Sequence, residues 1–123
     1  MLLKDFYTIS SLENTADSKY LATILINEEH EVFKGHFPGN PIMPGVCMMQ
    51  IIKELTEQIT ESPLFMQSLS NVKFMALINP FNTPELRLEL DVATIEDNLV
   101  KVKNITCFNE TVALKLSCVY KKV

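Results

Sequence analysis

The sequence predicts an α+β fold in which one antiparallel sheet wraps around a single buried helix. One segment with helical character, residues 44–59, lies among several segments rich in β-favouring residues. The strands predicted after this helix follow one another through short polar turns, as in an antiparallel meander. With 123 residues the chain is long enough for one core, so a single domain over residues 1–123 is expected.

The strands are predicted from composition and alternation. Residues 1–10 are expected to form a short lead-in, whereas residues 20–26 are rich in aliphatic and β-branched side chains and predict a strand. Residues 85–95 alternate cleanly between apolar and polar, which is typical of a half-buried strand. Further strands are expected at 69–78, 99–108 and 112–118, with a loop at 79–84 and a basic tail at 121–122. Such a sheet of four to six strands leaves edges uncovered, and this favours dimerisation.

The helix is predicted by its start, its pattern and its end. Pro44 suits the first helical position, because a residue there needs no N–H for an intrahelical bond. Residues 46–52 are apolar almost all round except for Gln50, so the first two turns are expected to be buried. The pattern then becomes amphipathic, with Glu54 on the expected polar face. The Ser62-Pro63 pair predicts the end of the helix.

Composition excludes several function classes. The net charge of −4 argues against binding nucleic acid through phosphate contacts, and it fits an acidic carrier protein only if a local basic patch exists. No apolar run approaches the ~20 residues of a membrane span, so no membrane association is expected. No secretion signal is seen, which predicts a cytoplasmic protein. The three cysteines, an odd number without paired spacing, are expected to be free thiols buried in the core: Cys47, Cys107 and Cys118.

The most informative segment joins a histidine to the start of the helix. It is His36-Phe37-Pro38-Gly39-Asn40-Pro41-Ile42-Met43-Pro44-Gly45-Val46. Proline fixes φ and glycine permits positive φ, so the segment combines stiff and sharply bent positions. Because the helix begins within it, the segment is expected to hold an imidazole beside N–H groups that lack intrahelical partners.

This segment closely resembles the signature of the hotdog-fold β-hydroxyacyl-acyl carrier protein dehydratases. That signature is His-Phe-Pro-Gly-x-Pro-hydrophobic-Met-Pro-Gly followed by a helix, and the chain matches it at every defined position from His36 to Gly45. The resemblance implies a hotdog fold and a homodimer with two sites at the interface, or else a trimer of dimers or a heterodimer with a related subunit. Each site would combine His36 of one subunit with a residue of the partner's helix. In the family that residue is a carboxylate, and Gln50 stands at its position here.

The resemblance also implies an activity. It is the elimination of water from a 3-hydroxyacyl thioester, carried by acyl carrier protein or coenzyme A, in fatty-acid or related acyl-chain biosynthesis, without metal or organic cofactor. Neutral His36 suits the base, because an unperturbed imidazole has a pKa of about 6.5. The N–H of Gly45, with that of Val46, suits an oxyanion. Gln50 is able to hydrogen-bond a hydroxyl but has no acidic proton, and Glu54 is the candidate replacement one turn later.

Other residues are expected to contact the substrate. Met43, Met48 and Met49 are expected in the core or along an acyl tunnel, and Lys73 and Arg87 are candidates for docking a phosphopantetheine arm or a carrier protein. The residues expected to bind substrate are Phe37, Pro44, Val46, Met49 and Glu54.

Two other functions remain open at this point. One is a hotdog acyl thioesterase, in which Gln50 or Glu54 would orient a water for attack on the thioester carbonyl. The other is a non-catalytic acyl-binding subunit that pairs with an active dehydratase. A carboxylate at position 50 would favour the dehydratase strongly. Because Gln50 replaces it, the thioesterase and the acyl-binding subunit both stay open as alternatives.

Overall fold

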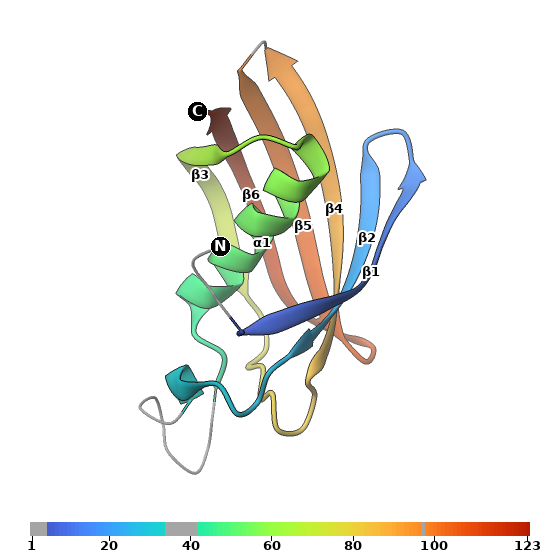
Figure 1. The fold of residues 1–123 in the computed structure, drawn as a ribbon, viewed down its shortest axis with the longest axis vertical. Helices are drawn as coiled ribbons and strands as arrows, with labels where there is room; N and C mark the ends of the chain where they lie inside the picture. The colour runs from blue at the N-terminus through green and yellow to red at the C-terminus, as the bar shows by residue number, and fades with distance from the viewer. Residues whose placement is uncertain (1–4, 34–41, 97) are drawn as a thin grey trace.

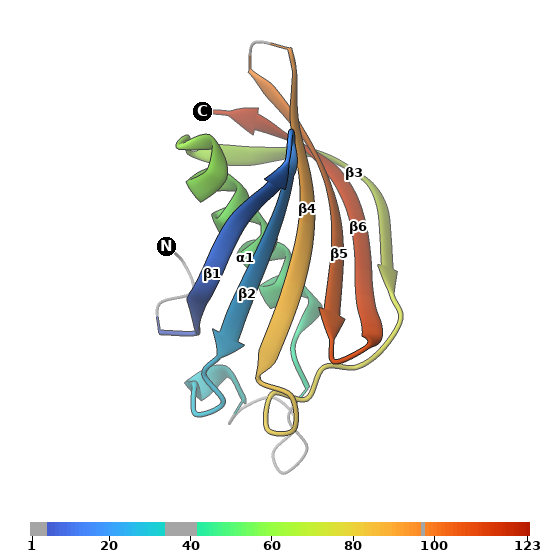
Figure 2. The same ribbon diagram turned by 90° about the vertical axis from the view of Figure 1, so that its right-hand side faces the viewer.

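The protein folds as one curved antiparallel sheet wrapped around a helix, as predicted. The structure is a computed structural model and describes residues 5–33, 42–96 and 98–123. Six strands form the sheet in the order β1-β2-β4-β5-β6-β3, and Figures 1 and 2 show it curling around the helix α1. In chain order the elements are β1 Tyr7–Ala16, β2 Lys19–Ile26, the short 3₁₀ helix η1 Glu31–Phe33, α1 Gly45–Thr60, β3 Leu64–Phe74, β4 Glu85–Glu96, β5 Leu99–Phe108 and β6 Thr111–Lys122.

The core lies between the inner face of the sheet and one side of α1. The strand β4 alternates as expected, so that Leu86, Leu88 and Leu90 are all buried while the intervening side chains point outward. The helix contributes a buried stripe that includes Ile51 and Leu55, both fully buried. Burying each such side chain stabilises the fold by about 1.5–3 kcal/mol. The inner face of the sheet and the stripe of α1 therefore account for the wrapped architecture.

The helix begins and ends close to the predicted residues. Pro44, expected as the first helical residue, is the N-cap instead, so the helix begins one residue later, at Gly45. At the other end Glu61 adopts a left-handed conformation with φ of 54°, and its N–H bonds the carbonyl of Glu57. No helix in the described part of the chain is long and apolar enough to cross a membrane.

Two strands differ from the sequence prediction because both are edge strands. The predicted lead-in at 1–10 contains the start of β1, and the strand predicted at 69–78 begins earlier, at Leu64. Most side chains of both strands are exposed, so neither segment shows the apolar alternation on which the prediction depends. The strand predicted from residue 112 continues through the basic residues Lys121 and Lys122, which belong to β6 and pair with β3.

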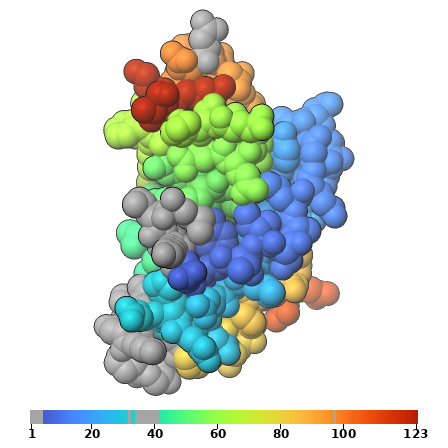
Figure 3. All heavy atoms as spheres, viewed as in Figure 1, coloured from blue at the N-terminus to red at the C-terminus, as the bar shows by residue number. Residues whose placement is uncertain are grey.

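Three burial predictions are also corrected. The helix start is not buried all round, since Val46 is 74% exposed and Met49 is half-buried. Glu54, expected on the polar face, is buried. Cys47 and Cys118 are buried free thiols as predicted, whereas Cys107 is half-buried on the outer face of β5. The exposure at the helix start agrees with the space-filling view, in which atoms of α1 remain at the surface on the side that the sheet leaves uncovered (Figure 3).

Candidate functional site

The start of α1 presents two backbone N–H groups without acceptors. The incoming segment is held by a hydrogen bond from the Met43 N–H to the carbonyl of Ile78, at 2.8 Å. The N–H groups of Cys47 and Met48 donate to the Pro44 carbonyl at 3.1 and 3.3 Å. Those of Gly45 and Val46 have no acceptor within the described ranges. Together with the helix dipole, they form a position that favours negative charge.

An apolar cavity of about 380 Å³ adjoins the start of the helix and is lined in part by Gly45. A Cβ added to Gly45 would lie 2.8 Å from Cζ of Phe74, so glycine allows this ring to approach the helix backbone closely. The cavity therefore offers space for an apolar chain next to unpaired donors. Its lining comes from the helix start, from the segment after β3 and from β6: Met43, Gly45, Met48, Phe74, Met75, Ala76, Leu77, Ile78 and Leu114.

A polar network lies on a different side of the same helix. Nε2 of Gln50 donates to Oε2 of Glu54 at 3.0 Å, and the hydroxyl of Tyr7 donates to Oε1 of Glu54 at 2.9 Å. Glu54 is only 8% exposed, and Gln50 is half-buried. A buried carboxylate needs such donors, because an unpaired buried charge is costly. The network therefore anchors Gln50 to the start of β1.

The pKa of Tyr7 is raised well above its usual value of 10.0, first by burial and then by the hydrogen bond to Glu54. Because the folded state keeps the phenolic proton that the unfolded chain loses, this contribution to stability is complete below pH 10 and declines as the pH rises above it. Urea unfolding at several pH values should show a shallower loss of stability above pH 10 for Tyr7→Phe than for the wild type.

The matched control is Tyr20→Phe, which removes a hydroxyl of β2 that makes no side-chain hydrogen bond in the described structure. Tyr120, whose pKa is also raised by burial, keeps part of the alkaline slope in both variants. Equal slopes for Tyr7→Phe and Tyr20→Phe would contradict the assignment. At neutral pH, Tyr7→Phe should cost about 1.5–3 kcal/mol, the usual contribution of a hydrogen bond to a charged group.

The structure separates the predicted site residues into two groups. Pro44, Gly45 and Val46 lie together at the helix start. Gln50 and Glu54 lie together on another side. Met49 is partly buried and packs against the core. His36 and Phe37 lie outside the described residues, so their predicted roles stay predictions. Tyr7 was missed, because a lone tyrosine in a weakly patterned segment gives no sequence signal.

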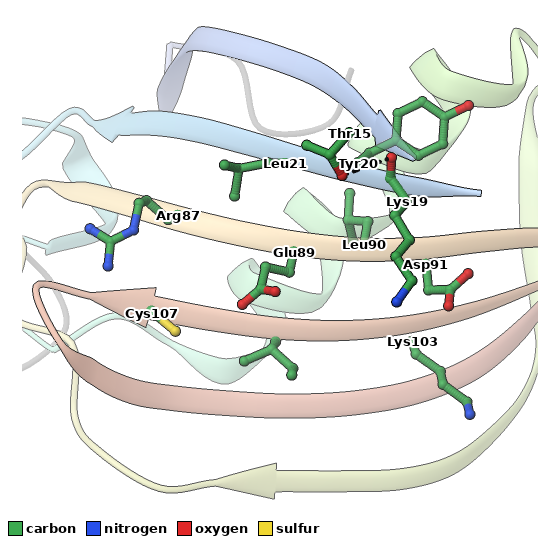
Figure 4. A pocket seen from close by; sticks show the side chains of 11 residues that line it. Thr15, Lys19, Tyr20, Leu21, Arg87, Glu89, Leu90, Asp91, Lys103 and Cys107 are labelled. Atoms are coloured by element: carbon green, nitrogen blue, oxygen red, sulfur yellow. Dashed lines mark hydrogen bonds between the residues drawn. The ribbon is translucent and has the colours of Figure 1, made fainter. Parts of the chain in front are cut away.

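A second hollow, of about 500 Å³, lies on the face of the sheet away from α1. Its lining includes three basic side chains, those of Lys19, Arg87 and Lys103. Two acidic side chains, those of Glu89 and Asp91, lie between them (Figure 4). Opposite charges alternate across the strands here, since Lys19 pairs with Asp91 and Asp91 with Lys103. Such alternation is typical of a solvated sheet face. The helix start and the Gln50–Glu54 pair, on the other face, remain the candidate site.

The fold and this site define a hotdog-fold protein. Solved hotdog structures superpose over nearly the whole chain at low sequence identity. A chain of "The Dehydratase Heterocomplex ApeI:P from Xenorhabdus doucetiae" has a TM-score of 0.75 at 17% identity, covering 94% of this chain and 97% of that one. A hypothetical thioesterase with coenzyme A from Streptococcus pneumoniae TIGR4 has a TM-score of 0.67 at 9% identity, covering 95% and 85%.

The chain belongs to the ApeI-like family, since the model of this family, described as ApeI dehydratase, matches residues 12–113. It is 29% identical over 99 residues to a 3-hydroxyacyl-[acyl-carrier-protein] dehydratase FabZ of Caulobacter sp. (strain K31), covering 73% of this chain and 58% of the relative. It is 32% identical over 87 residues to the enzyme of that name from Lactobacillus helveticus (strain DPC 4571), covering 65% and 56%. The chain thus spans little more than half the length of these relatives.

Proposed function

We propose that this protein is a 3-hydroxyacyl thioester dehydratase. The observation that carries the proposal is the pair of unpaired N–H groups of Gly45 and Val46 at the start of α1, where Gly45 lines an apolar cavity. These donors suit the thioester oxygen, where charge develops when the neighbouring carbon loses a proton. The cavity suits the acyl chain. Membership of a dehydratase family and the similarity to the FabZ enzymes support the same reaction.

The proposed reaction needs one base and one oriented hydroxyl. Neutral His36 removes the proton from the carbon next to the thioester carbonyl. A carbon–carbon double bond then forms as the bond to the 3-hydroxyl breaks with its electron pair on oxygen. Gln50 supplies no proton, because an amide has no acidic hydrogen. The proton that His36 has taken therefore goes to the departing oxygen, and the products are the enoyl thioester and water.

The geometry of α1 supports a site shared between two chains. At about 100° per residue, the Gln50 side chain lies roughly 140° around the helix from Gly45. The Gly45 side borders the cavity, whereas Gln50 shares the partly exposed side with Val46, Lys53 and Glu57. One thioester held at Gly45 would therefore meet Gln50 from a second copy, or from a related subunit, rather than from the same chain.

The edge strand β3 supports the same assembly. It pairs with β6 on one side only, and its other edge is free within the described structure. It exposes large apolar side chains, including Phe65 at 63% and Phe74 at 56%. Exposed apolar edges are normally covered. Sedimentation at micromolar concentration should show a dimer or a larger assembly, and a stable folded monomer would contradict the shared site.

Acyl carrier protein is the proposed carrier of the substrate. The strands β3, β5 and β6 contain six lysines and no acidic residue, and this excess of positive charge supports binding of an acidic carrier. Lys73 and Lys115 are exposed cross-strand partners. Their neighbours in the next register position, Phe74 and Leu114, line the cavity. Because side chains alternate along a strand, the two lysines stand on the outer face of the sheet, at the same end of β3 and β6 as the cavity, and there we propose that they meet the carrier.

Reversing both charges, in Lys73→Glu with Lys115→Glu, should raise KM for a carrier-linked substrate about tenfold at low ionic strength. KM for a short thioester without the carrier should stay unchanged, because the chemistry does not use these lysines. The control is Lys101→Glu with Lys121→Glu, which makes the same charge change at the other end of the strands. Equal effects of the two double variants would show non-specific attraction and would remove this docking site.

A thioesterase is the second candidate, and the Gln50–Glu54 pair is the observation that favours it. The free carbonyl oxygen of Gln50 could hold a water by accepting its hydrogen bond. Incubation with a 3-hydroxyacyl thioester and with a saturated acyl thioester distinguishes the candidates. The proposal predicts enoyl thioester from the first and no change in the second. Free thiol from either would favour the thioesterase, and no product from both would favour an acyl-binding subunit.

A further inference from the structure

The carboxylate of Glu54 joins two elements at the buried side of α1. Oε1 accepts the Tyr7 hydroxyl of β1 at 2.9 Å, and Oε2 accepts the Gln50 amide from the preceding helical turn at 3.0 Å. Glu54 is nearly buried, so it has little freedom to leave these donors. The position of the carboxylate is therefore set from the strand, and the carboxylate in turn sets the Gln50 side chain.

This arrangement decides which end of the Gln50 amide remains available. A carboxylate only accepts hydrogen bonds, so the NH₂ end of Gln50 must face Glu54. The other end is the carbonyl oxygen Oε1, which has no hydrogen-bond partner within the described ranges. Gln50 is half-buried on the uncovered side of the helix, so this oxygen is within reach of an incoming molecule. A group that approaches Gln50 from this side meets an acceptor.

We infer that Glu54 is a positioning residue, which holds Gln50 so that its Oε1 accepts a hydrogen bond from the 3-hydroxyl of the substrate. The inference rests on the proposed function, because it places the 3-hydroxyacyl chain at the site shared with a second copy. It assigns to Glu54 a role different from that of a proton donor. Both of its oxygens are already engaged, one by Tyr7 and one by Gln50.

The inference predicts that the protein distinguishes a 3-hydroxyacyl thioester from the saturated thioester of equal length. A neutral hydrogen bond contributes about 1 kcal/mol net, which corresponds to roughly fivefold in affinity. Glu54→Gln should abolish this preference, because an amide at position 54 can donate as well as accept and no longer fixes the direction of Gln50. Affinity for the saturated thioester should stay unchanged.

The experiment is calorimetric titration of the full chain carrying His36→Ala, which prevents turnover, with the two thioesters. The matched control is Glu57→Gln, one turn further along α1, where the carboxylate accepts the Leu64 N–H at 2.8 Å and makes no hydrogen bond to Gln50 or Tyr7 within the described residues. Glu57→Gln should keep the hydroxyl preference. Loss of the preference in Glu54→Gln alone supports the inference, and an equal preference in both variants overturns it.

A second variant keeps the test valid if Glu54→Gln does not fold. Gln50→Met removes the acceptor oxygen at similar size, so it should also abolish the hydroxyl preference, and a retained preference would overturn the inference. The binding readout is independent of turnover by the wild type. A protein that shows the preference but forms no enoyl product would refute the dehydratase proposal and leave the positioning role. A protein that forms enoyl product without the preference would support the dehydratase proposal and refute the positioning role.

Discussion

His36→Ala should lower the rate of dehydration by about 10²–10⁴, the usual contribution of a general acid–base group. In the proposed reaction His36 takes the proton from carbon and returns it to the departing hydroxyl, so both proton transfers are lost together. The melting temperature should stay nearly unchanged, because the side chain is assigned to chemistry. The measurement is the rate of enoyl formation, paired with thermal unfolding of the same sample.

His30→Ala is the matched control for His36→Ala. His30 is the chain's other histidine, and its ring packs edge-on against Phe6 with the ring centroids 5.0 Å apart. Its loss should affect stability and leave turnover per folded molecule intact. Full turnover in His36→Ala would rule out the mechanism.

Gln50→Glu should raise the dehydration rate by up to about 10², because it supplies the acidic proton that the amide lacks. The structure gives a reason to expect that the introduced carboxyl group keeps its proton, in addition to its partial burial. The new carboxyl group would stand where Nε2 of Gln50 now lies, 3.0 Å from the Glu54 carboxylate. Two carboxylates at that distance repel each other, which raises the pKa of one of them, so it keeps its proton to a higher pH and is able to act as an acid.

The rate of enoyl formation as a function of pH measures this effect. Gln50→Glu should gain a limb that falls as the shared proton is lost at higher pH. The control is the double variant Gln50→Glu with Glu54→Gln, which keeps the new acid and removes the neighbouring charge. In this double variant the carboxyl group at position 50 should lose its proton at a lower pH than in the single variant. A single variant no faster than the wild type would mean that acid catalysis is not what Gln50 limits.

The parts of the fold that could be predicted are those in which burial imposes a clear period. The strand β4 lies in the interior of the sheet, so its alternation of Leu86, Leu88 and Leu90 was enough to place it. The edge strands β1 and β3 have little buried surface, and their positions depend on pairing with distant partners. Pairing of this kind does not produce a regular alternation of apolar and polar residues in the sequence.

The candidate site was predictable in part for a similar reason. The glycine and proline pattern located the helix start, where Gly45 and Val46 present their N–H groups. The burial of Glu54 could not be predicted, because helical spacing placed it among polar neighbours. Its burial depends on Tyr7, 47 positions earlier in the chain, and contacts over such a separation follow only from the assembled sheet.

The proposed dehydration is tested most directly by the products formed from a 3-hydroxyacyl thioester in ¹⁸O-labelled water, identified by mass spectrometry. Elimination leaves the thioester bond intact, so the account predicts an enoyl thioester that has lost one water and carries no label. Attack of water on the thioester carbonyl would instead release free thiol and a 3-hydroxy acid with one labelled oxygen. That second outcome would contradict the dehydratase and establish hydrolysis as the reaction of this site.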